Sequence, residues 1–370
     1  MAPDPEDYDS EGYLEALSRQ DESDFLDLYE STFSDIDSDR VRTELSNRIS
    51  QVEREIIESA QSIVGGFHPR RRSLQDASEF EFEFFSPLCE LEVDGGDLLM
   101  ARADYSSLHL CIVTCQVGGE NPHSWVDRVN EISYHLEDSE ILGRLKRQLG
   151  CESHAVDTIQ YITLAREIDL LEFEYSNIEH LVEPDNYTVW ERNRDEQEFR
   201  YRGGTLGHQD LTDAIEQGFD YGSIGAPTIQ YIVGSHPVLA LEEIVYTLLT
   251  DHLNESDDYP QEFDRSEFKQ RYESPLHLGA QGNEYDEVVE REVDRLLSFG
   301  GHINLIETDS EKIDSERDYD LKFSGEKPYL AKKAVQRKFL NTEVPVERGR
   351  RAYGRAKESF EPQSTNLGQI

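Results

Sequence analysis

The chain has 370 residues, of which 36% are hydrophobic and 10% aromatic, and 78 acidic residues against 36 basic ones give a formal net charge of −42. The apolar content suffices for a packed core, which argues against global disorder. Four cysteines are too few for a disulfide scaffold, and no run approaches the ~20 apolar residues that cross a bilayer.

Acidic residues are spread through almost every segment, and only nine of the basic residues are lysines. In dilute buffer such a chain repels itself. In several molar salt the screening length falls to roughly 3 Å or less, and a carboxylate-rich surface stays hydrated. The composition therefore predicts a protein adapted to the salt of an extreme halophile. Residues 1–13 lack the basic and apolar runs of a signal peptide, so we expect a cytoplasmic protein without membrane association.

Residues 1–40 carry fourteen acidic residues and two basic ones, which predicts a mostly disordered N-terminus. Sparse apolar residues such as Phe25 and Tyr29 leave open a short helix that docks elsewhere on the protein. Over 41–64 apolar residues recur every three or four positions, so a long helix is expected there, ended by the glycine pair at 65–66.

Predicted strands and helices then alternate, which favours one α/β domain over 41–253. Alternating or apolar runs predict strands over 80–85, 90–102, 108–117, 158–166, 186–192 and 227–233. Apolar residues in the helical period predict helices over 125–136, 208–222 and 236–253. Cys111 and Cys115 fall on one face of a strand about 13 Å apart, too far for a disulfide, and are expected to be buried.

The C-terminal third is expected to hold a second, smaller unit. Residues 254–285 are polar and broken, which predicts a linker. A small α+β unit is expected over 286–341, and it suits either a winged-helix-like module or a packed appendage. Residues 342–370 are expected to form a basic tail.

Two neighbouring predicted strands lie between the helix over 41–64 and the helix over 125–136. Asp97 lies within the run expected over 90–102, and Thr114, Cys115 and Gln116 lie near the end of the strand expected over 108–117. The order of a helix, an antiparallel strand pair with a short turn, and a helix resembles the core of the restriction-endonuclease-like (PD-(D/E)XK) nuclease superfamily. This resemblance implies an α/β fold with a central mixed sheet flanked by helices. It implies Asp97 in the first acidic position, Thr114 in the second and Gln116 in the lysine position.

Hydrolysis at such a site needs carboxylates that hold a divalent metal and a cation near the attacking water. Because Thr114 and Gln116 are neutral, we expect Asp97 to hold Mg²⁺ weakly, even with Glu120 as a second ligand, and catalysis to be impaired. Two alternatives stay open. The site is an active nuclease that recruits other carboxylates, namely Glu120, Asp94, Glu55 or Glu58, or else residues 94–97 form a tight turn in an ordinary acidic surface.

The segment from Lys322 to Lys357 holds eleven basic residues and three acidic ones. A basic helix face with an Arg-rich extension is the electrostatic footprint of phosphate binding. The candidate nucleic-acid-binding residues are Lys332, Lys333, Arg337, Lys338, Arg348, Arg350, Arg351 and Arg355. Charge alone does not hold DNA in molar salt, because six contacts would lose about seven decades of affinity over a twentyfold rise in salt. Packing on the chain's own acidic surface and a protein partner are the alternatives.

These patterns together predict a nucleic-acid-associated protein with a nuclease-like, catalytically impaired core. An active divalent-metal-dependent DNA endonuclease and a non-enzymatic interaction or scaffold protein remain as alternatives. His208 and His236 lie beside predicted helix starts, where we expect loop or helix-start histidines in preference to catalytic ones.

Overall fold

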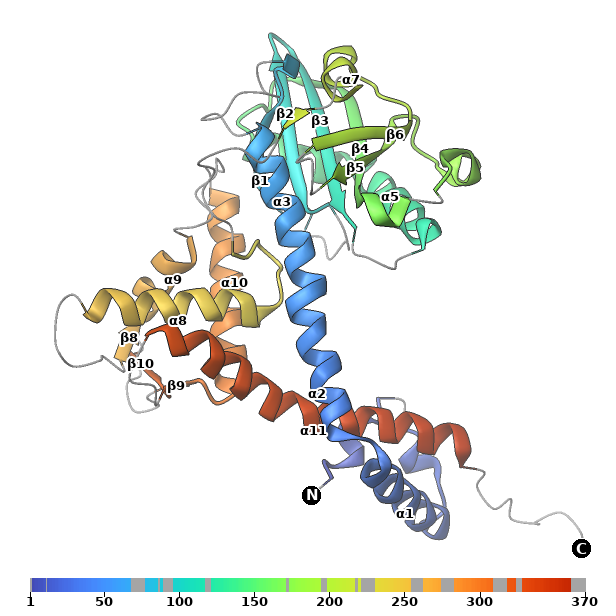
Figure 1. Cartoon of the computed structure of the whole chain (residues 1–370), viewed down its shortest axis with the longest axis vertical. Helices are drawn as coiled ribbons and strands as arrows, with labels where there is room; N and C mark the ends of the chain where they lie inside the picture. The colour runs from blue at the N-terminus through green and yellow to red at the C-terminus, as the bar shows by residue number, and fades with distance from the viewer. Residues whose placement is uncertain are drawn as a thin grey trace, which may run out of the picture.

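The computed structural model of the chain describes residues 2–10, 12–67, 77–85, 87–88, 96–116, 121–170, 173–193, 198–216, 219–220, 230–253, 262–273, 283–308, 318–323 and 328–360. A long helical rod made of α2 (Ser38–Asn47), a π-helical turn (Arg48–Glu53) and α3 (Arg54–Phe67) joins a sheet-containing part to a helical part (Figure 1). Within these residues, no helix combines the length and apolarity needed to cross a bilayer.

The central sheet is mixed, and its seven strands follow the order of the chain. The strands are β1 (Glu81–Phe85), β2 (Leu98–Asp104), β3 (Ser107–Cys115), β4 (Ala155–Arg166), β5 (Tyr187–Asn193), β6 (Glu198–Gly204) and β7 (Phe219–Asp220). β3, β4 and β5 run parallel, and the other neighbours are antiparallel. Leu98 in β2 pairs with Val113 in β3. The predicted α/β class with a mixed central sheet is confirmed.

Both faces of the sheet are buried over β2 to β5, because alternate side chains of these strands enter different cores. Met100, Cys111 and Val113 enter one core, to which α3 contributes Ile63. The intervening residues of the same strands enter a second core with α5 (Pro122–Leu136) and α6 (Ser139–Gln148). The predicted burial of Cys111 and Cys115 on one face is confirmed.

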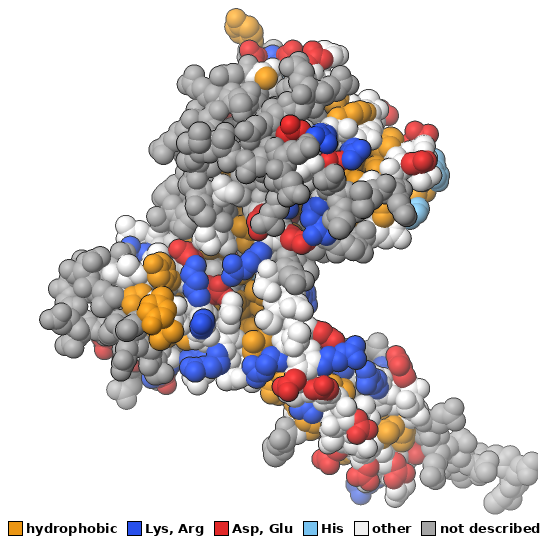
Figure 2. All heavy atoms as spheres, viewed as in Figure 1, with side chains coloured by type: hydrophobic (Ala, Val, Ile, Leu, Met, Phe, Trp, Pro, Cys, Tyr) orange, Lys and Arg blue, Asp and Glu red, His pale blue; other side chains and the backbone are white. Residues whose placement is uncertain are grey.

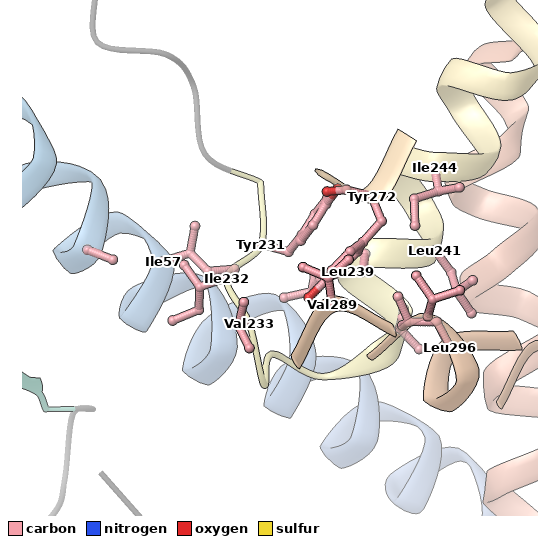
Figure 3. Packing of buried hydrophobic residues seen from close by; sticks show 14 of the residues in the cluster. Ile57, Tyr231, Ile232, Val233, Leu239, Leu241, Ile244, Tyr272, Val289 and Leu296 are labelled. Carbon is pink, nitrogen blue, oxygen red and sulfur yellow. The ribbon is translucent and has the colours of Figure 1, made fainter. Parts of the chain in front are cut away.

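The helical part forms around α8 (Pro237–Leu253), which packs against α9 (Arg265–Glu273), α10 (Asn283–His302) and α11 (Ala331–Ser359). A small antiparallel sheet lies beside these helices, in the order β8 (Glu262–Asp264), β10 (Asp318–Leu321), β9 (Ile306–Thr308). Figure 3 shows how Tyr231, Ile232 and Val233 lie between Ile57 of α3 and the residues of α8.

Two predicted boundaries differ from this arrangement. The predicted linker over 254–285 contains β8 and α9, because Phe268 and Tyr272 are buried anchors in an otherwise polar sequence. The predicted domain boundary at 253 falls directly after α8, which packs with the C-terminal helices. Residues of the sheet, of α8 and of the unit predicted over 286–341 share one core.

The N-terminal segment also differs from the disorder predicted over 1–40. α1 (Arg19–Asp35) buries Phe25, Tyr29 and Phe33 against the C-terminal half of α11. The segment therefore forms a docked helix, the alternative that the sequence left open. α11 continues through Pro345 to Ser359, so the predicted basic tail over 342–370 is helical over most of its length.

The remaining short elements are α7 (Gln209–Glu216), which lies near the turn between β2 and β3 (Figure 1), and a set of 3₁₀ helices. These 3₁₀ helices span Pro5–Tyr8, Leu14–Ala16, Glu167–Leu170, Tyr175–Asn177, Glu179–Leu181 and Pro328–Leu330.

Candidate functional site

The residues of the predicted site meet at one edge of the central sheet. Asp97 directly precedes β2, and its Oδ2 accepts a hydrogen bond from the backbone N–H of Cys115 at 2.6 Å. The backbone N–H of Gly96 donates to Oγ1 of Thr114 at 3.3 Å. Both contacts follow from the pairing of Leu98 with Val113, which aligns the start of β2 with the end of β3.

Gln116 lies just beyond β3 and is fully buried. Its backbone N–H donates to the carbonyl of Leu164 in β4 at 2.8 Å, and its Oε1 accepts from Nη1 of Arg128 at 3.4 Å. Arg128 belongs to α5, so a neighbouring helix places a cation beside the position where the resemblance implies a lysine. A guanidinium supplies positive charge there, but it stays protonated and does not act as a base.

Two arginines end the next strands along the same edge. Arg166 in β4 and Arg192 in β5 are direct partners in the parallel ladder. Arg192 is almost fully buried. Burial, and then the charge of Asp97, raise the pKa of the Cys115 thiol, while the charge of Arg192 lowers it. Asp97, Cys115 and Arg192 therefore share one electrostatic environment.

Glu55 and Glu58 of α3, the alternative metal ligands, face these arginines. Nη1 of Arg166 lies 2.6 Å from Oε1 of Glu55, and Nη1 of Arg192 lies 3.7 Å from Oε2 of Glu58. Arg166 also pairs with Asp169 at 2.8 Å. These contacts fix α3 on the strand ends, and they occupy the carboxylates that a metal would need.

The described residues of this edge do not fit a Mg²⁺ site. Thr114 and Gln116 carry no charge, and the α3 carboxylates are paired with arginines, so Asp97 is left without a charged second ligand among the described residues of this edge. Within the described residues, the side chains that approach closely enough to share a metal ion do not include Asp97. Glu120 and Asp94 lie outside the described residues.

Most of the predicted nucleic-acid-binding residues on α11 have partners in the chain itself. Lys332 pairs with Glu243 at 2.8 Å, and Lys338 donates to the carbonyl of Asn304. The other partners are Phe33 for Arg348, Glu347 for Arg350, and both Glu44 and Glu347 for Arg351. For these five residues the structure matches the alternative in which the basic segment packs on the chain's own surface.

The other three predicted residues are Lys333, Arg337 and Arg355. All three are exposed, and none has a hydrogen-bond or ion-pair partner in the part of the chain that the structure describes. Figure 2 shows lysine and arginine side chains gathered in the region of α11, while acidic side chains gather over α1.

Comparisons of the chain with protein-family models, with curated proteins and with solved structures found no match.

Sequence reasoning found Asp97, Thr114 and Gln116, which the strand pairing brings together, but it missed Arg128, Arg166 and Arg192. Arg166 and Arg192 carried a usable signal, because each is a charged residue at the end of an apolar strand. Arg128 carried none, since nothing in the period of α5 indicates that it reaches Gln116.

Proposed function

We propose that this protein binds nucleic acid through α11 and does not cleave it. The observation that carries the proposal is that Lys333, Arg337 and Arg355 are exposed and have no partner among the described residues, in a chain with 78 acidic residues and 36 basic ones. In such a chain a nearby carboxylate is the ordinary partner of an exposed base. Lys333 and Arg337 lie one helical turn apart, so they present two positive charges on one face, as phosphate binding requires.

The resemblance to a nuclease core supports the same proposal. The sequence of α3, the antiparallel strands β1 to β3, and α5 has the order implied by the resemblance to the restriction-endonuclease-like superfamily. Asp97 stands at the start of β2, beside neutral Thr114 and Gln116. A frame of this kind, with neutral Thr114 and Gln116 in two of the three motif positions, is suited to binding without hydrolysis.

The number of contacts limits the strength of this binding. Each phosphate contact contributes about 0.9 to the slope of log affinity against log salt. Three contacts, from Lys333, Arg337 and Arg355, would lower the affinity about 500-fold for a tenfold rise in salt. We therefore expect measurable binding in moderate salt and weak binding in molar salt, unless hydrogen bonds to the nucleic acid add to it.

The test is the binding of a fluorescent DNA duplex to the full chain across a series of KCl concentrations. Lys333→Ala with Arg337→Ala should weaken binding and lower the salt slope by about 1.8. The matched control is Lys332→Ala with Arg350→Ala, which removes the same charge from the same helix at residues that already have partners, and it should leave the slope nearly unchanged.

A plasmid-nicking assay with Mg²⁺ tests the second half of the proposal. No nicking is expected. Nicking that Asp97→Ala abolishes would instead identify an active nuclease. Absence of duplex binding at low salt, or equal slopes for the two double variants, would contradict the proposal and favour an interaction or scaffold protein.

A further inference from the structure

A second group of chemically active side chains lies at the opposite end of β2 from Asp97. Asp104 is the last residue of β2, His109 lies in β3, and His208 directly precedes α7. One ligand atom from each of these residues lies within 4.8 Å of the others. Because β2 spans seven residues, this group is about 20 Å from Asp97 by strand rise and forms a separate site.

The imidazole of His109 is held in the orientation that a metal ligand needs. Its Nδ1 lies 2.9 Å from the hydroxyl of Thr158 and 3.7 Å from a carboxylate oxygen of Asp157. The other ring nitrogen, Nε2, lies 3.5 Å from Oδ2 of Asp104, so oxygen neighbours on both sides hold the ring in place. A metal ion bound at Nε2 would leave the proton on Nδ1, where Thr158 and Asp157 can accept it.

Asp104 is oriented in a similar way. Its Oδ1 accepts a hydrogen bond from Nε of Arg102 at 3.1 Å, which leaves Oδ2 on the side of His109. Partners that fix the orientation of a ligand through its other atom are the usual surroundings of a protein metal site.

His208 supplies the independent observation. Its Nδ1 is buried and has no hydrogen-bond partner in the described part of the chain, although a buried polar atom normally has one. The ring lies 5.0 Å from that of His109 and meets it edge to face.

A hydrogen-bonded pair of Asp104 and His109 would explain only part of this arrangement, because it leaves His208 without a role. In tetrahedral coordination with bonds of 2.0–2.1 Å, neighbouring ligand atoms are about 3.3 Å apart. The Asp104–His109 distance already approaches this value, and the widest spacing in the group needs to close by no more than about 1.5 Å.

We propose that Asp104, His109 and His208 bind one divalent first-row transition-metal ion, for which Zn²⁺ is the best fit. Two imidazoles and one carboxylate are typical ligands of Zn²⁺ and leave a fourth position for water. The ion joins the turn between β2 and β3 to the segment in front of α7, two parts of the chain that are about 100 residues apart in sequence.

The test uses the full chain after treatment with EDTA, in nitrate salt because chloride itself binds Zn²⁺. Co²⁺ is titrated while visible absorption is recorded, and Zn²⁺ is then added to displace it. We expect one equivalent of Co²⁺ with the intense absorption of four-coordinate Co²⁺, which separates this site from weak binding by surface carboxylates. Zn²⁺ should also raise the unfolding temperature.

Variants assign the site to its residues. His208→Ala and Asp104→Asn should each weaken binding about 100-fold or more, and Thr158→Val about tenfold to 100-fold, because it removes only the partner of a ligand. The control is His302→Ala, since His302 also lies beside a carboxylate, Glu343, at 2.8 Å but outside the group.

Stoichiometric binding that is lost in the ligand variants and kept in the control supports the proposal. Two results overturn it. One is the absence of four-coordinate absorption, and the other is equal Co²⁺ affinity in wild type and His208→Ala.

Discussion

His236 shows how one buried side chain couples stability to pH. Its ring lies between those of Phe299 and Phe339, with centroid distances of 5.9 Å and 5.2 Å. Its Nδ1 accepts a hydrogen bond from the backbone N–H of Val238 at 3.3 Å, so a neutral imidazole caps the start of α8. The predicted helix-start position of His236 is confirmed. Burial, with the nearby charges of Arg48 and Arg295, lowers its pKa to about 4.

We therefore expect acid to destabilise the protein through His236. The folded-state pKa lies below the ordinary value of 6.5, so the unfolded chain takes up this proton first as the pH falls. The stabilisation is complete above pH 6.5 and is lost down to about pH 4, by roughly 3 kcal/mol in total. The measurement is the free energy of unfolding in denaturant at several pH values.

His236→Asn provides the comparison, because Asn retains a cap acceptor and does not titrate. The many carboxylates titrate in both proteins, so the quantity of interest is the difference between the two curves. This difference should change between pH 6.5 and 4. Parallel curves would show that His236 has no such role.

At the scale of elements, a glycine sets the distance between α10 and β9. A Cβ on Gly300 would lie 2.5 Å from Cδ1 and 2.9 Å from Cγ1 of Ile306, which is buried in the core. The next residue, Gly301, is exposed, and the nearest atom to its Cβ would be 3.9 Å away. The same helix turn therefore contains a crowded and an open glycine.

Gly300→Ala should destabilise the protein by about 1–3 kcal/mol, because the buried Ile306 has little room to move. Gly301→Ala should be neutral or stabilising by up to about 1 kcal/mol, since alanine favours the helix. Denaturant unfolding of both variants checks the pair. Equal effects would show that the approach of α10 to β9 is not tight.

The sequence predicted helices and strands well where apolar residues kept the period of one element over its whole length. The strand expected over 108–117 is β3, and the helix expected over 236–253 is α8. β6 was missed because arginines alternate along it and hide the strand pattern. Residues 230–233 of the strand expected over 227–233 form no strand, since the apolar run fills the core between α3 and α8 (Figure 3). Residues 227–229 lie outside the described residues.

The two sites differ in how far the sequence predicts them. The Asp97 region depends on a hairpin between neighbouring strands, so local patterns suffice to bring Asp97 and Thr114 together. The proposed metal site at Asp104 and His109 also needs His208, and the position of His208 depends on how the segment before α7 returns to β2. Long-range contacts of this kind leave no period in the sequence, and for this reason His208 was expected to be an ordinary loop histidine.

At the scale of the whole molecule, the dominant feature is the excess of negative charge, which opposes folding to a compact state. Even if each basic residue neutralised one acidic residue, 42 carboxylates would remain without a cation. Their mutual repulsion favours the expanded, unfolded chain. Adaptation to molar salt is our proposal for how the fold tolerates this charge.

We expect the unfolding temperature to rise as KCl increases from about 0.2 M to about 2 M, because the screening length falls from near 7 Å to near 2 Å. NaCl should act in nearly the same way if screening is the cause. Thermal unfolding followed by circular dichroism provides the measurement. An unfolding temperature that is constant or falls over this range would argue against salt adaptation.

The packing of α1 on α11 also constrains how the protein is made. Phe25 meets Tyr353 and Phe360 edge to face, with ring centroids 5.6 Å apart in both pairs. Over 300 residues must leave the ribosome after α1 before these rings exist to receive it. α1 therefore has no docking surface during most of translation, and its dense negative charge keeps it hydrated until synthesis of α11 completes the fold.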